Sequence, residues 1–209
     1  MRNRIFLQLA LVAAVAPASL AAAGEFNPTL NIGDPAPAWS KLPGVDGKNY
    51  SLDDFKEKDV LVVAFTCNSC PYAVDYEDRL IAFSKAHCGE GKKVALIAVN
   101  VNKVEEDLPD QMKARAKEKG FNFPYLFDES QKIAKDFGAT FTPEFFIIGK
   151  DRKIVYMGSM DDSTEADKVK TKYVEAAVAA ALKGEVPATK ETAAKGCLVR
   201  YAKERRKKP

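Results

Sequence analysis

Two uninterrupted apolar runs dominate the pattern of hydrophobic and polar positions along the chain. The first is "VLVVAF", Val60 to Phe65, and the second is "KVALIAVNV", Lys93 to Val101. Short runs of aliphatic and β-branched residues without alternation are typical of strands buried on both faces. The sequence therefore predicts two central strands of a parallel sheet.

Helical periodicity follows the first run. The segment from Cys70 onward places apolar or aromatic residues on one stripe, and Gly89 can end the helix. The stripe consists of Tyr76, Leu80, Phe83 and His87.

Two more helices are predicted between the second run and residue 138. Pro109 opens "PDQMKARAKEKG", a polar helix that closes at Gly120. Asp128 with Gln131 forms a start resembling a capping box for the next helix, which stops at Gly138.

Turn residues between short apolar pieces predict two hairpins. "VDGK" separates the pieces around Trp39 and Tyr50, and "GKDR" separates "FFII" from "KIVYMG". "FPYLFDE" predicts a short strand or turn.

A last helix is predicted from about Thr164 to Lys183, with Gly184 after it. Its expected buried stripe is Val169, Tyr173, Ala176 and Ala180. The tail from Glu185 has no clear period.

This order of elements predicts an α/β fold. Strands that alternate with helices indicate a parallel core with helices on its faces, and the late hairpin adds antiparallel strands. The expected fold class is a sandwich with a central mixed sheet flanked by helices and an N-terminal β-hairpin extension.

The amino terminus has the pattern of a secretory signal peptide. Arg2 and Arg4 precede an apolar run, and Ala21 and Ala23 form an A-x-A site. The run is too short to cross a bilayer comfortably, although an uncleaved membrane anchor is the alternative. We therefore expect a signal peptide at 1–23, a single domain at 24–184 and a C-terminal tail at 185–209, in an exported protein that is periplasmic or secreted and keeps no stable membrane span after cleavage.

Composition and charge indicate an ordinary globular protein without a nucleic-acid partner. Hydrophobic residues make up 46% and charged residues 29% of the chain, as in an ordinary globular protein. The net charge of +3 is too small to argue for a nucleic-acid partner, and the basic end "KERRKKP" lacks interleaved aromatic residues.

The pair Cys67-x-x-Cys70 carries the candidate chemistry. A strand-to-helix junction would place Cys67 near a helix N-cap, where free amides and the helix dipole favour a thiolate. Thiolates are the reactive form of cysteine, so Cys67 would attack a partner disulfide and Cys70 would resolve the mixed disulfide. Pro71 is tolerated in the first helical turn.

The order of motifs resembles the thioredoxin-like redoxin family, the AhpC/TSA–TlpA/ResA-like thiol-disulfide proteins. The motifs are "GDPAP", "DGKNYSLDDF", "VLVVAFTCNSCPYAVDYEDRL", "FPYLFDESQKIAKDFGATFTPEFFII" and "YMGSMDD". The resemblance implies a thioredoxin-like fold, a redox-active disulfide between Cys67 and Cys70, and Pro143 as a cis-proline facing it. Thr142 and Pro143 would then bind the substrate chain. No metal or organic cofactor is implied.

The chain departs from thioredoxin itself at two places. Leu61 stands at about the position of a buried acid, so Glu144 beside Pro143, or water, would handle the proton of Cys70. The dipeptide Asn68-Ser69 is neither Gly-Pro nor a pair that contains histidine, so no redox potential carries over.

Three other functions compete with disulfide exchange. The peroxidase pattern P-x-x-x-T-x-x-C fails, because Val62 and Ser69 stand where Pro and Cys would fall around Thr66. A copper module could use the two soft thiolates, but His87, the only histidine, lies on a helical stripe. An inert structural disulfide is the third.

The remaining cysteines, Cys88 and Cys197, leave three hypotheses open. Cys197 can pair with Cys88 as a structural staple, fold back towards Cys67 as a third redox thiol, or remain free. The even cysteine count favours the staple. The sequence as a whole predicts an exported thiol-disulfide oxidoreductase whose partners are protein thiols or disulfides and an electron donor or acceptor redox protein.

Overall fold

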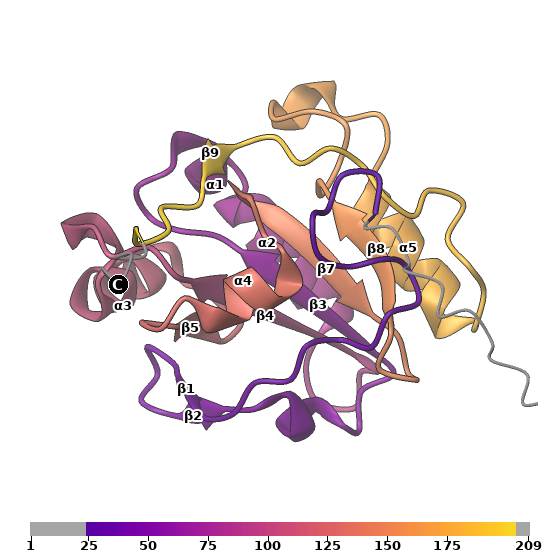
Figure 1. Ribbon diagram of the computed structural model, residues 1–209, viewed down its shortest axis with the longest axis horizontal. Coiled ribbons are helices and arrows are strands. Elements are labelled where there is room, and N and C mark those ends of the chain that lie inside the picture. Colours follow the sequence, from indigo (N-terminus) through magenta and orange to yellow (C-terminus); the bar gives the residue numbers. More distant parts are fainter. Residues whose placement is uncertain (1–23, 204–209) are drawn as a thin grey trace, which may run out of the picture.

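A computed structural model describes residues 24–203 of the chain. The predicted signal peptide lies outside the described residues. A mixed sheet of five strands, in the order β5-β4-β3-β7-β8, forms the centre of the molecule (Figure 1). The predicted fold class, a mixed sheet flanked by helices, is confirmed.

The two apolar runs form the central strands. β3 (Val60–Phe65) pairs in parallel with β4 (Val94–Asn100), and every residue of both strands is buried. β5 (Tyr125–Phe127) extends the parallel part. The second predicted hairpin, β7 (Glu144–Ile148) and β8 (Ile154–Gly158), adds the antiparallel strands.

Helices cover both faces of the sheet. α2 (Glu77–His87), α3 (Pro109–Lys119) and α5 (Tyr173–Leu182) bury apolar side chains against one face. α4 (Lys132–Phe137) covers the other face together with residues from the N-terminal segment. That segment contains the 3-10 turn Leu52–Phe55 and the first predicted hairpin, which is confirmed as β1 (Leu42–Pro43) with β2 (Asn49–Tyr50).

The helix predicted after Cys70 is two helices. α1 (Pro71–Asp75) ends at Tyr76, whose backbone begins α2. Tyr76 is buried, and its ring stacks against Arg79, with the guanidinium carbon 3.5 Å from the ring centroid. The periodicity of the apolar stripe continues across the break, which is why the sequence predicted one helix.

Two predicted helix starts are wrong. α4 begins at Lys132 with Gln131 as its N-cap, and Asp128 instead accepts the amide of Ile133 from outside the helix. The Gln131 side chain binds backbone elsewhere, at Val101, Arg200 and Ala202, so it takes no part in a capping box.

The last helix starts at Tyr173 rather than Thr164, and a 3-10 turn, Ala166–Lys168, precedes it. Its buried residues are Val174, Ala177 and Val178, one or two positions after the predicted stripe. The tail from Glu185 forms one short strand, β9 (Cys197–Leu198), which pairs with β6 (Phe141–Thr142). No helix within residues 24–203 is long and apolar enough to cross a membrane.

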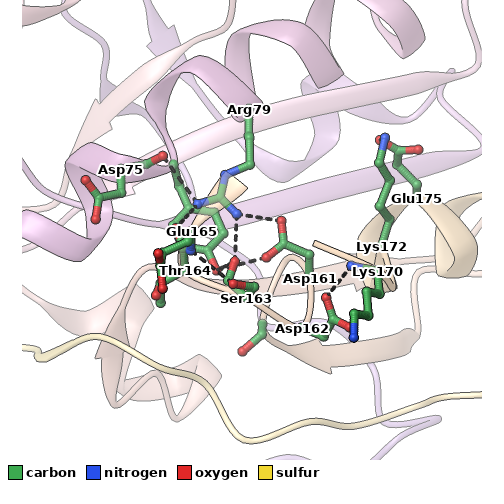
Figure 2. Close-up of polar contacts among 12 residues, drawn as sticks. Asp75, Arg79, Asp161, Asp162, Ser163, Thr164, Glu165, Lys170, Lys172 and Glu175 are labelled. Carbon is green, nitrogen blue, oxygen red and sulfur yellow. Dashed lines mark hydrogen bonds and ion pairs between the residues drawn. The ribbon is translucent and has the colours of Figure 1, made fainter. Parts of the chain in front are cut away.

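An arginine holds the irregular connection between β8 and α5 against α2 (Figure 2). One guanidinium nitrogen of Arg79 donates to Asp161 at 2.7 Å and to the carbonyl of Ser163 at 2.9 Å. The other donates to the carbonyl of Thr164 at 2.6 Å. Only 15% of the Arg79 side chain and 4% of the Asp161 side chain are exposed, so this ion pair is largely shielded from water.

Replacing Arg79 with methionine should lower the free energy of unfolding by about 3 kcal/mol, because the change leaves the buried Asp161 carboxylate without its cation. Chemical denaturation measures this loss. Lys172→Met is the matched control on the same connection: its ion pair with Glu175 is exposed, and the loss should stay below about 1 kcal/mol. Equal losses in the two variants would contradict the assignment.

Candidate active site

The Cys67–Cys70 loop lies at the carboxyl end of β3. Cys70, in an extended conformation at φ −96° and ψ 116°, is the N-cap of α1, and Pro71 is the first helical residue. The prediction that Cys67 lies near the N-cap is therefore wrong by about one turn. The amides at the start of the helix act on Cys70, whose sulfur interacts with the backbone of Ala73.

Both sulfurs of the pair lie beside Thr142. Cys67 Sγ is 3.4 Å from the hydroxyl of Thr142 and 3.8 Å from that of Ser69. Cys70 Sγ is 3.0 Å from the Thr142 carbonyl oxygen. Cys67 is 3% and Cys70 1% exposed, and both are free thiols in this structure.

Each sulfur of the pair changes the pKa of the other. The hydrogen bond with Cys70, then burial and the charge of Asp107, raise the pKa of Cys67. The hydrogen bond with Cys67 lowers the pKa of Cys70 to about 5. Both directions favour a single negative charge in the pair, held on Cys70. The Cys70 S–H donates to the Thr142 carbonyl in this structure, and that hydrogen bond favours the protonated form of Cys70.

The peptide bond between Thr142 and Pro143 is cis, as the resemblance implied. Binding of a substrate chain by Thr142 and Pro143 stays a prediction. In this structure the backbone of Thr142 pairs with Cys197 of the tail.

Glu144 lies away from the sulfurs. Its carboxylate accepts the amides of Thr140 and Phe141 at 2.7 and 2.9 Å, and burial raises its pKa. These bonds fix the turn that leads into Thr142. The geometry therefore gives Glu144 a positioning role, in contrast to the expected proton transfer to Cys70.

An acid that the sequence analysis missed holds the dipeptide between the cysteines. Asp107, fully buried, accepts the amides of Asn68 and Ser69 at 2.7 and 2.9 Å, and the Ser69 hydroxyl at 2.6 Å. Leu61, by contrast, lies in the apolar core. Nothing in the acidic run "EEDLPD" separates Asp107 from its neighbours, so the sequence alone does not identify it.

A second missed residue fixes the same dipeptide from β5. The hydroxyl of Tyr125 donates to the side-chain oxygen of Asn68 at 3.1 Å, and the Asn68 amide group donates to the Glu106 carbonyl. Asn68 and Ser69 are thus held by three residues, which fixes the direction of Cys67 towards Thr142.

The Cys88–Cys197 staple is wrong. Cys88 ends α2, beside Val94 at the start of β4, whereas Cys197 pairs with Thr142 near the opposite end of the sheet. The 11 residues of α2 alone span roughly 16 Å. Cys197 instead packs against Cys67 and Cys70 and interacts directly with the thiol of Cys70.

Within residues 24–203, no three histidine, cysteine or acidic side chains are placed to share a metal ion. His87 is half-buried and stacks on Phe83, with the ring centroids 4.7 Å apart.

Large apolar side chains are exposed on segments that border the sulfurs. They are Tyr72, which follows Cys70 by two positions, Leu108, which follows Asp107, and Leu198, which follows Cys197. Their exposed fractions are 45%, 40% and 64%. Exposed apolar surface next to a reactive group is typical of a protein-docking site.

Fold and site together define a redoxin with a thioredoxin-like architecture. The Redoxin family model matches residues 31–174, and the chain belongs to this family. Thiol-disulfide oxidoreductase ResA of Bacillus thuringiensis is 30% identical over 128 residues, which are 60% of this chain and 68% of the relative. A candidate peroxiredoxin of Mycobacterium tuberculosis is 31% identical over 114 residues, which are 53% of this chain. The chain spans 65% of that relative's length.

Two solved structures are similar over most of the chain. An uncharacterised conserved protein from Geobacillus kaustophilus has 33% identity and a TM-score of 0.78, with 86% of this chain and 96% of that chain covered. A hypothetical protein from Sinorhizobium meliloti has 32% identity and a TM-score of 0.77, with 84% and 97% covered. Both similarities support the fold.

Removing the charge of Asp107 should make Cys67 more acidic. In a Cys70→Ser background, where Cys67 titrates alone, Asp107→Asn should move the midpoint of iodoacetamide alkylation against pH to lower pH, because a nearby negative charge disfavours a thiolate. Asp110→Asn is the control, since Asp110 is exposed in the first turn of α3. A midpoint that stays in place, or moves equally in both variants, would refute the role of Asp107.

Proposed function

We propose that this redoxin exchanges disulfides with partner proteins through Cys67 and Cys70. The observation that carries the proposal is the contact of two buried thiols with the residue before a cis-proline. The lowered pKa of Cys70 provides a base beside Cys67 that can take its proton, and an inert structural disulfide needs no such base. The similarity to thiol-disulfide oxidoreductase ResA supports the same reaction class.

The first step is attack by Cys67 on a partner disulfide. The Cys70 thiolate takes the proton of Cys67 as the Cys67 sulfur forms a bond to one partner sulfur. The other partner sulfur leaves as a thiolate and takes that proton from Cys70. Cys67 is the better attacking group because hydroxyls of Thr142 and Ser69 face its sulfur, whereas a carbonyl faces Cys70.

The second step resolves the mixed disulfide. The Cys70 thiolate attacks the Cys67 sulfur, the Cys67–Cys70 disulfide forms, and the remaining partner sulfur leaves and is protonated by water. The partner loses its disulfide and the protein gains one, so two electrons pass to the partner. The reverse sequence oxidises a dithiol partner, and the direction depends on the potential of the pair relative to the compartment.

The proposal also covers the kind of partner, a protein substrate, and the location of the protein outside the cytoplasm. The exposed side chains of Tyr72, Leu108 and Leu198 offer apolar contact to a protein substrate. The signal-peptide pattern before residue 24 supports export to the periplasm or beyond, where partner disulfides form and persist.

Peroxidase activity is the second candidate, and the similarity to a candidate peroxiredoxin favours it. The missing P-x-x-x-T-x-x-C pattern weighs against it. Turnover of hydrogen peroxide with reduced protein separates the two functions: peroxide consumption faster than disulfide exchange would favour the peroxidase.

Single cysteine variants should separate the two roles. Cys67→Ser should abolish reduction of a protein disulfide, whereas Cys70→Ser should accumulate mixed disulfides with the partner, because nothing in that variant resolves the bond at Cys67 as efficiently. Non-reducing gels and mass spectrometry measure both effects, and Cys88→Ser is the control that should behave as wild type. Mixed disulfides that accumulate in Cys67→Ser but not in Cys70→Ser would reverse the roles.

The reduction potential of the Cys67–Cys70 pair tests the proposal itself. Equilibration with glutathione or dithiothreitol should give a value above about −300 mV, in the range of catalytic pairs. A lower potential, as in structural disulfides, together with no exchange activity, would overturn the proposal.

A further inference from the structure

We propose that Cys197 is a third redox thiol, which takes over the disulfide from the buried Cys67–Cys70 pair and presents it at the surface. This inference rests on the proposed function and extends it to the C-terminal tail.

Strand pairing holds Cys197 in place. Cys197 lies opposite Thr142 in the pairing of β9 with β6, and the amide of Val199 donates to the Thr140 carbonyl at 2.8 Å. Thr142 is the residue whose carbonyl and hydroxyl contact Cys70 and Cys67. One residue therefore fixes the positions of all three sulfur-bearing side chains.

Further bonds fasten the tail on both sides of β9. Downstream, the Arg200 amide donates to Asn102 at 2.9 Å, and the Tyr201 hydroxyl donates to the Ala139 carbonyl at 2.6 Å. Upstream, the amide of Thr192 donates to the Met157 carbonyl at 3.1 Å. The contact of Cys197 with Cys70 is thus part of an anchored segment.

Gly196 shows how closely the tail approaches the site. A Cβ at this position would lie 2.1 Å from the Thr142 carbonyl oxygen and 2.6 Å from its carbon. Only glycine fits between the tail and the backbone beside the cis-proline. The same carbonyl contacts Cys70, so the glycine brings the following residue, Cys197, to the Cys67–Cys70 pair.

Cys197 is more exposed to solvent than Cys67 and Cys70, so a second protein can reach it more easily. Cys67 and Cys70 are buried, whereas Cys197 is half-buried on a strand whose next residue, Leu198, is 64% exposed. A disulfide between Cys70 and Cys197 would be easier for a second protein to reach than one between Cys67 and Cys70.

The step is an isomerisation without net oxidation. After the Cys67–Cys70 disulfide forms, the Cys197 thiolate attacks the Cys70 sulfur. The Cys70–Cys197 bond forms, the Cys67–Cys70 bond breaks, and Cys67 leaves as a thiolate that takes up the proton lost by Cys197. Two sulfurs remain oxidised throughout, and Cys67 is again free.

Charge on Cys70 controls the timing of this step. Burial, followed by the hydrogen bond and charge of Cys70, raises the pKa of Cys197 to about 11 in the reduced protein. Once Cys70 enters a disulfide it carries no charge, so the two effects of Cys70 disappear and ionisation of Cys197 becomes easier. Cys197 therefore gains reactivity when the first disulfide has formed.

Disulfide mapping tests the proposal directly. Reduced full-length protein is oxidised with one equivalent of diamide, quenched in acid, alkylated and digested with trypsin. Cys67 and Cys70 fall on the peptide of residues 59–79 and Cys197 on that of residues 196–200. We expect the two peptides to be linked in a substantial fraction of wild-type protein, and in most of the Cys67→Ser protein.

Matched variants show which cysteine, Cys67 or Cys70, forms the disulfide with Cys197. In Cys70→Ser the linked peptide should fall about ten-fold below its level in Cys67→Ser, because Cys70 is the thiol that Cys197 contacts. Cys88→Ser should map as wild type. Gly196→Val keeps every thiol but displaces the tail, so it should lose the link and retain the Cys67–Cys70 disulfide; Leu198→Ala, on the exposed side, should retain both.

A glutathione titration provides a second measurement. The redox midpoint is expressed as the ratio of squared reduced glutathione to oxidised glutathione. The form with the Cys70–Cys197 disulfide adds to the oxidised population of the wild-type protein. Cys197→Ser lacks this form, so its midpoint should shift by about two-fold or more towards easier reduction. A normal Cys67–Cys70 disulfide and normal exchange, with neither the linked peptide nor this shift, would overturn the third thiol and leave the proposed function intact. Absence of any disulfide at Cys67 or Cys70 would overturn both.

Discussion

The position of Thr142 is the constraint on which the site depends. Its hydroxyl faces Cys67, its carbonyl faces Cys70, and its backbone pairs with Cys197. That position follows from the sheet register, since Glu144 pairs with Phe65 only two residues before Cys67. The buried side chains of β3 and β7 fix this register, because a slip by one residue would reverse the faces of both strands. Core packing thus determines which atoms meet the sulfurs.

Charge at the site is balanced by opposing contacts. The amide at Ala73 stabilises a thiolate on Cys70, while the Thr142 carbonyl and burial oppose it. Asp107 binds the amides of Asn68 and Ser69, which would otherwise be available to an anion near Cys67, and adds a negative charge of its own. One anion shared by two sulfurs is therefore favoured over two separate thiolates.

Local patterns predicted most of the fold. The apolar runs became β3 and β4, and Gly120 and Gly138 end α3 and α4 in the left-handed conformation. The errors occurred where distant contacts override local preference. The Arg79 network keeps residues 161–164 out of a helix, and Gln131 bonds to the tail instead of to its own helix start.

The sequence also predicted the cysteine pair, and the family resemblance implied the cis-proline facing it, but neither indicated the surrounding residues. Asp107 and Cys197 lie 37 and 127 positions after Cys70, so no spacing rule connects them to the pair. Asp107 reaches the pair through the loop after β4, and Cys197 through a strand of two residues. Such contacts depend on chain topology, which periodicity does not encode.

The tail also changes how a protein substrate would approach. A thioredoxin-like site receives an extended partner chain along the backbone before the cis-proline, and here β9 already occupies that edge. Under the proposed function, an incoming partner disulfide must displace β9 to reach Cys67. Displacement has a low cost at Cys197 and Leu198, because a two-residue strand makes few ladder bonds and Leu198 is largely exposed. The anchors at Thr192 and Tyr201 lie outside the strand, so the tail can open at Cys197 while both its ends stay attached. The same strand thus covers the buried pair and carries Cys197, the sulfur that takes up the disulfide in the proposed isomerisation.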